Sequence, residues 1–155
     1  MKILFSITLA LFLLFTSCKK DVQFLSKHTV TWDIQSMQID FINTAGNTDS
    51  TRSSGISGFF IFYNTPTTGA DPFYLNTHAI TVNGMEIHAA AFYKTDGKTL
   101  TLETSIGSTP VREYSISGAK KDEMTLDYSG PLNFFYAGPT SWTVKEHIVL
   151  KRIKY

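Results

Sequence analysis

Hydrophobic and polar residues alternate in short runs from about residue 28 to the end of the chain. In residues 28–34 (HTVTWDI) and 37–42 (MQIDFI), every second side chain is apolar. Alternation with a period of two is typical of half-buried β-strands. The apolar positions are even-numbered in the first run and odd-numbered in the second, so the pattern predicts a bulge or bend near Gln35 and Ser36.

Similar runs follow, separated by turn residues. The clearest hairpin is centred on Asn83-Gly84, a pair that suits the two positive-φ positions of a type I′ turn. Residues 43–57 are polar and predict a loop. The further predicted strands cover residues 58–64, 73–82, 85–94, 99–104, 111–117, 122–129 and 142–153.

Eight to nine strands joined by short connections define the expected fold class. Consecutive hairpins favour an all-β, up-and-down antiparallel β-barrel of about eight strands, with a β-sandwich as the alternative. Closure into a barrel would remove the exposed strand edges that invite aggregation.

The N-terminus has a different pattern, and it leads to the only cysteine of the chain. Residues 3–15 are almost wholly apolar, but they are too few for a membrane-spanning helix, which needs about 20 residues. They follow Lys2 and precede the small residues Thr16 and Ser17, an order typical of a secretory signal.

The sequence LFTSC, residues 14–18, resembles the lipobox of bacterial lipoproteins. In that family the cysteine thiol receives a diacylglyceryl group, the leader is removed, and the new amino terminus is often acylated as well. The resemblance implies lipid attachment at Cys18, with residues 1–17 as signal peptide, 18–27 as lipidated linker and 28–155 as barrel domain.

Charge and anchor together predict the surroundings of the protein. Without Lys2 the chain has 13 basic and 13 acidic residues, so it lacks the electrostatic footprint of a nucleic-acid-binding protein. The expected partner is a membrane, contacted through the lipid anchor, and the expected location is the cell envelope. Lys19 stands where some lipoproteins carry the aspartate that retains them at the inner membrane, which favours the outer membrane.

A second resemblance covers residues 28–153. The stretches LTLETSIGSTPVREYSISGAKKDEMTLDYSG and WTVKEHIVLKRI, with the early Trp32, resemble small lipocalin-like lipoproteins. The resemblance implies a last strand that closes the barrel against the first, with Arg152 packing over Trp32. Lipocalins usually carry glycine two residues before this tryptophan, whereas this chain has Val30.

The sequence offers little for catalysis or for metal binding. In GISGF, residues 55–59, Phe59 stands where a serine hydrolase elbow requires its second glycine. The histidines are scattered, and the two beside the predicted hairpin turn are not directly paired across it; the four are His28, His78, His88 and His147. We therefore expect no enzyme activity, no metal and no cofactor.

Glu146 shares a strand face with apolar neighbours, Val144 and Ile148 among them, so its carboxylate is expected inside the barrel. There it must be paired, protonated or in contact with water. A solid barrel would give it an arginine partner, and a hollow one would make it a ligand contact.

Two further groups of residues are candidate ligand contacts. Residues 130–142 form a long connection that carries Phe134, Phe135 and Tyr136, which either gate a ligand site or cover the end of the core. Ala89 and Ala91 are small residues on one strand face, which leave a cavity or fit the taper of the barrel.

These candidates leave two hypotheses for a non-enzymatic lipoprotein of the cell envelope. In the first, the barrel binds a small apolar or amphipathic molecule through Ala89, Ala91, Glu146 and the three aromatic residues of the long connection. In the second, a filled barrel serves as an interaction, accessory or inhibitor module for an envelope protein. The volume of the barrel interior separates the two.

Overall fold

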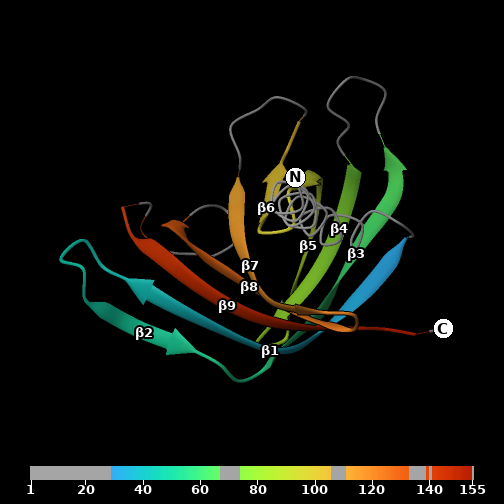
Figure 1. The fold of residues 1–155 in the computed structure, drawn as a ribbon. Helices are drawn as coiled ribbons and strands as arrows, with labels where there is room; N and C mark the ends of the chain where they lie inside the picture. The colour runs from blue at the N-terminus through green and yellow to red at the C-terminus, as the bar shows by residue number, and fades with distance from the viewer. Residues whose placement is uncertain (1–28, 67–73, 106–110, 133–138, 140, 155) are drawn as a thin grey trace, which may run out of the picture.

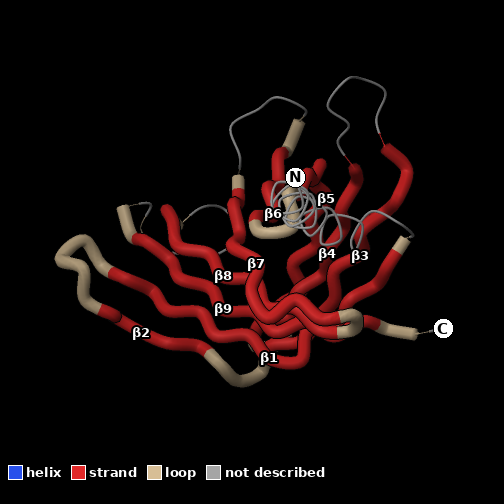
Figure 2. Tube along the Cα trace, in the orientation of Figure 1, coloured by secondary structure: helices blue, strands red, loops and turns tan. Residues whose placement is uncertain are grey.

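The structure, a computed structural model, describes residues 29–66, 74–105, 111–132, 139 and 141–154. These residues form β-strands and turns, and they contain no helix (Figure 2). The strands are β1 (Val30–Ile42), β2 (Thr48–Arg52), β3 (Ile56–Pro66), β4 (Tyr74–Val82), β5 (Met85–Thr95), β6 (Thr99–Glu103), β7 (Arg112–Lys120), β8 (Glu123–Pro131) and β9 (Thr143–Arg152).

The strands form one antiparallel sheet in the order β2-β1-β3-β4-β5-β6-β7-β8-β9, and β1 also pairs with β9. This last pairing closes the sheet into a lipocalin-like barrel and leaves β2 outside the ring. Figure 1 shows β1 and β9 side by side at the point of closure. The closure confirms the predicted barrel and rules out the sandwich alternative. In the closing pair, Trp32 lies opposite Arg152.

β1 joins the first two predicted runs into a single strand of 13 residues. Its register against β9 shifts between Ile34 and Ser36, which confirms the predicted bulge. The extra residue lets Ile34 and Met37 both be buried, so the two runs of opposite phase present their apolar side chains to one core.

The prediction of a loop over residues 43–57 is wrong in part. Thr48–Arg52 form β2, which pairs with the second half of β1, and β3 already begins at Ile56. All β2 side chains are exposed. A strand that is held by backbone pairing and buries no apolar side chain leaves no alternating pattern in the sequence.

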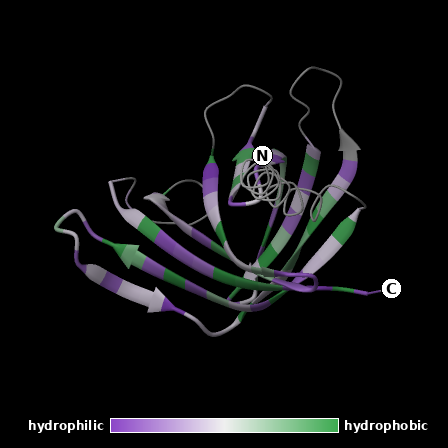
Figure 3. Cartoon of the chain, viewed as in Figure 1, coloured by the Kyte–Doolittle hydropathy of each residue, from purple (hydrophilic) through white to green (hydrophobic). Residues whose placement is uncertain are grey.

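The inward-facing side chains of the eight barrel strands fill a continuous hydrophobic core. Figure 3 shows the alternation along the strands as bands of hydrophobic and hydrophilic residues. Trp32, Phe62 and Tyr93 are fully buried in this core. Burial of such large aromatic side chains is the main source of stability expected for a barrel of this size.

The backbone at Gly58 and at the Asn83-Gly84 turn explains how the β3–β4–β5 wall is built. Gly58 has φ +146°, and a Cβ atom there would overlap the carbonyl oxygen of Ala79, so β3 and β4 approach as only glycine allows. Asn83 and Gly84 have φ values of 51° and 80°, and Val82 pairs with Met85. These angles confirm the predicted type I′ turn.

Candidate functional site

The barrel interior contains an ion pair between β7 and β9. Nη2 of Arg112 lies 3.0 Å from Oε1 of Glu146, and the two side chains are 2% and 1% exposed. The hydroxyl of Tyr114 donates a hydrogen bond of 2.8 Å to Oε2 of Glu146. The guanidinium carbon of Arg112 lies 4.2 Å from the ring centroid of Tyr128 on β8. Glu146 therefore has the arginine partner expected of a solid barrel.

His78 enters the same region from β4. Its ring stacks on Phe60 with centroids 5.0 Å apart, and its Nδ1 lies 3.0 Å from Oδ1 of Asn76. Burial lowers the pKa of His78 to about 4, and the positive charge of Arg112 acts in the same direction. The ring is therefore neutral at pH 7. Since the Nδ2 group of Asn76 donates to the carbonyl oxygen of Ile61, Nδ1 of His78 is assigned as the donor to Oδ1 of Asn76.

The cavity beside this polar cluster is small. Its volume is about 10 Å³, and its walls are His78, Ile80, Ile87, Leu102, Arg112, Tyr114 and Glu146. That volume is close to the space of a single water molecule, about 10–15 Å³. Sites for small organic ligands usually measure about 300–1,000 Å³. Within the described residues, this part of the interior is filled by protein.

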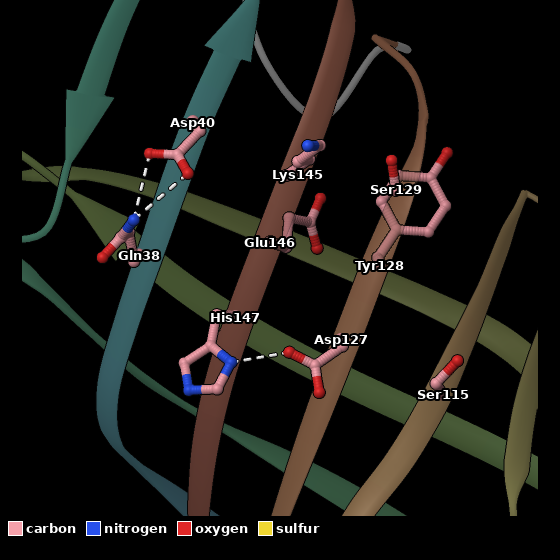
Figure 4. A pocket seen from close by; sticks show the side chains of 9 residues that line it. All are labelled: Gln38, Asp40, Ser115, Asp127, Tyr128, Ser129, Lys145, Glu146 and His147. Carbon is pink, nitrogen blue, oxygen red and sulfur yellow. Dashed lines mark hydrogen bonds and ion pairs between the residues drawn. The ribbon is translucent and has the colours of Figure 1, made fainter. Parts of the chain in front are cut away.

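A larger pocket lies on the outside of the barrel wall formed by β1, β9, β8 and β7 (Figure 4). We call it the outer-face groove; its volume is about 390 Å³, and its lining residues are Gln38, Asp40, Ser115, Asp127, Tyr128, Ser129, Lys145, Glu146 and His147. Because side chains alternate along a strand, Lys145 and His147 point outward while Glu146 between them points into the barrel.

The outward side chains of the outer-face groove bond to one another. Nδ1 of His147 lies 2.6 Å from Oδ1 of Asp127, and these residues are direct partners across β9 and β8. Gln38, opposite His147 on β1, donates from Nε2 to both carboxylate oxygens of Asp40 at 3.1 Å. Figure 4 shows both contacts within the groove. The groove is thus lined by polar groups held in defined positions.

The outer-face groove contains one contact between an acid and a histidine. The contact between Asp127 and His147 resembles the base and orienting acid of a hydrolase triad. In the part of the chain that the structure describes, no hydroxyl or thiol is bonded to His147. Among the residues that the structure describes, no group of three or more histidine, cysteine, aspartate or glutamate side chains could hold a metal ion.

The structure describes some of the site residues predicted from the sequence, whereas others lie outside the described residues. Glu146 lines the interior cavity. Ala91 is buried opposite Asn76, and Ala89 is half-buried opposite His78, but neither borders that cavity. The remaining candidates lie outside the described residues, so lipid attachment and the aromatic gate stay predictions; these are Cys18, Phe134, Phe135 and Tyr136.

Sequence reasoning missed Arg112, Tyr114 and the outer-face groove. The run VREYSIS places Arg112, Tyr114 and Ile116 on one strand face, a pattern that could have revealed an inward arginine. The groove leaves no local pattern, since its residues meet through the pairing of β7, β8 and β9 with one another and with β1, which is distant in sequence.

Comparison of the chain with protein-family models, with curated proteins and with solved structures finds no match in any of the three. Among the described residues, no helix has the length and hydrophobicity needed to cross a membrane.

Proposed function

We propose that this protein is a lipid-anchored β-barrel of the cell envelope that binds a partner through its outer-face groove and catalyses no reaction. The observation that carries the proposal is the contrast between the interior cavity and the outer-face groove, one of two surface pockets of several hundred Å³ among the described residues. The interior cavity measures about 10 Å³, whereas the groove measures about 390 Å³. The resemblance of residues 14–18 to a lipobox supports the anchor.

The filled part of the interior around Arg112 and Glu146 weighs against an apolar ligand at this place inside the barrel. Where such a ligand would lie, Arg112 and Glu146 neutralise each other and Tyr114 bonds to the same carboxylate. A ligand would have to separate this pair, and a buried charge without its partner is costly.

The interior can be tested with Ala91→Leu and a fluorescent fatty acid. Ala91 is 5% exposed within the core, so the larger side chain should overpack it and lower the free energy of unfolding by about 1–3 kcal/mol. The parent chain, prepared from residue 19 onward and checked by circular dichroism, should show no saturable uptake of the probe. Saturable uptake by the parent that Ala91→Leu abolishes without destabilisation would restore the interior ligand site.

The groove can be tested in cells by photo-cross-linking. A photoreactive amino acid at Ser129, an exposed residue of the groove, should form a cross-linked product with a partner. The control position is Glu86 on the outside of β5, which does not line the groove. Equal cross-linking from both positions, or none from Ser129, would contradict a specific role of the groove.

A further inference from the structure

This inference rests on the proposed function, in which the outer-face groove is a binding site. The charges of the groove then restrict the class of ligand that it can bind. Its outward charges are the carboxylates of Asp40 and Asp127 and the ammonium of Lys145, with His147 paired to Asp127. Charges of both signs thus stand on adjacent strands. Polyanions require a surplus of positive charge, which this surface lacks, and a polycation would have to place its charges beside Lys145.

The position of the groove within the sheet disfavours an extended peptide. β9 pairs with β8 and with β1, and β8 pairs with β7 and with β9, so both central strands have their two edges occupied. A peptide that binds by strand addition needs a free edge. Protein interfaces also rely on buried aromatic or aliphatic anchors, whereas the outward lining of the groove is polar.

The spacing of polar groups fits a chain of hydroxyl-bearing rings. Strand pairing aligns Gln38, His147, Asp127 and Ser115 in one row across four strands. Neighbouring strands are about 4.8 Å apart, so the row offers a polar group at intervals close to the length of a pyranose ring. Hydroxyl groups both donate and accept, and the row offers acceptors on the aspartate and donors on the glutamine and histidine.

The groove residues are also held in place before any ligand binds. Asp40 accepts hydrogen bonds from Gln38 and from Oγ1 of Thr51, the latter at 2.7 Å. Asp127 contacts His147 and accepts a hydrogen bond from Ser117 at 3.2 Å. Side chains that are already ordered lose less entropy on binding. The groove volume of about 390 Å³ is in the usual range for small-molecule sites, about 300–1,000 Å³.

We propose that the outer-face groove binds an uncharged oligosaccharide. The saccharide lies along the row of Gln38, His147 and Asp127, and its hydroxyls bond to these side chains. Lys145, which has no ion pair within the described residues, donates to a further hydroxyl or ring oxygen.

Titration calorimetry on the full-length protein, in a zwitterionic detergent without a sugar headgroup, tests this proposal. The probes are cellotetraose, mannotetraose and chitotetraose, with tetragalacturonate as the anionic and a chitosan tetramer as the cationic comparison. At least one uncharged tetrasaccharide should bind saturably and more tightly than either charged one. His147→Ala and Gln38→Ala should each weaken that binding about fivefold, as expected for the loss of one hydrogen bond.

A second contact between a histidine and an acidic residue, elsewhere on the outside of the barrel, provides the control for His147 and Asp127. His88 on the outside of β5 contacts Glu86 at 3.2 Å, and its side chain is 67% exposed, against 57% for His147. His88→Ala should leave saccharide binding unchanged. The proposal is overturned if no uncharged tetrasaccharide binds, if a charged one binds more tightly, or if His88→Ala weakens binding as much as His147→Ala. Cross-linking of a protein from Ser129 without saccharide binding would retain the proposed function and overturn only the ligand class.

Discussion

Arg112 and Glu146 place opposite charges inside the barrel, where solvation by water is largely lost. Their side chains are 2% and 1% exposed, and the atoms Nη2 and Oε1 are 3.0 Å apart. Removing one partner of such a buried pair typically costs about 3–5 kcal/mol, because the other charge remains buried without its partner. Replacing both with apolar residues of similar volume is often close to neutral.

We therefore expect Arg112→Met to lower the free energy of unfolding by about 3–5 kcal/mol. The double variant Arg112→Met, Glu146→Leu should recover most of that loss. Urea unfolding of the wild type, both single variants and the double variant measures the coupling. If the double variant is as unstable as Arg112→Met, then bonds to other groups, such as that from Tyr114, outweigh the ion pair.

His78 makes the stability of the barrel depend on pH. Burial first, and then the charge of Arg112, lower its pKa from 6.5 to about 4. Between these values the unfolded chain binds a proton that the folded protein does not, so the free energy of unfolding falls as the pH falls from about 6.5 to about 4. At about 1.4 kcal/mol per pH unit, this group contributes about 3 kcal/mol to that loss.

His78→Gln should reduce the slope of stability against pH in this range, because glutamine takes up no proton. Chemical denaturation at several pH values between 4 and 7 checks the expectation. The comparison with wild type removes the contribution of carboxylates that titrate in both proteins. Equal slopes in the two proteins would show that His78 is not buried in its neutral form.

The β4–β5 hairpin depends on its two-residue turn. Both central residues have positive φ, and Gly84 has no neighbouring heavy atom within 4 Å of where a Cβ atom would lie. A substitution at Gly84 therefore changes the backbone energy without adding a steric contact. The turn fixes the register in which His78 pairs with Ala89 and Val82 pairs with Met85.

We expect Gly84→Val to lower the free energy of unfolding by about 1–3 kcal/mol, because a β-branched residue tolerates positive φ poorly. Gly84→Asn is the control, since asparagine adopts this conformation more readily and should cost less. Thermal unfolding of both variants measures the difference. A melting temperature that both variants share with the wild type would contradict the importance of the turn.

The whole molecule combines a closed barrel with the predicted lipid anchor at Cys18. Two or more acyl chains hold a protein stably to a membrane, since each buried methylene contributes about 0.8 kcal/mol. Closure by β1 and β9 leaves β2 at an edge of the sheet. The anchor would thus hold the barrel at the membrane, with the outer-face groove on the outside of the barrel wall.

Cys18→Ser should prevent lipid attachment and leave an uncleaved precursor. Metabolic labelling with radioactive palmitate, followed by gel electrophoresis, should show label in the wild type and none in the variant. Cell fractionation is the second readout. A mature, unlabelled Cys18→Ser protein that remains with the membranes would contradict the anchor.

Local patterns in the sequence were sufficient to predict most of the strands, the bulge after Ile34 and the turn at Asn83-Gly84. The physical reason is that each feature depends on residues close together in the chain. Side chains alternate with a period of two along a strand, a change of phase requires an extra residue, and positive φ favours glycine and asparagine. The eight-stranded barrel followed from the order of these elements.

β2 was missed because it lacks a hydrophobic pattern, whereas the arginine partner of Glu146 and the outer-face groove depend on long-range pairing. β2 is exposed throughout, so hydrophobic alternation does not mark it. Arg112 lies 34 positions from Glu146 in the sequence, and the two meet because β7 and β9 flank β8 in the closed barrel. The groove brings Gln38 beside His147 through the pairing of the first strand with the last. Such contacts are set by strand register and barrel closure, since only these bring residues distant in the chain to the same place.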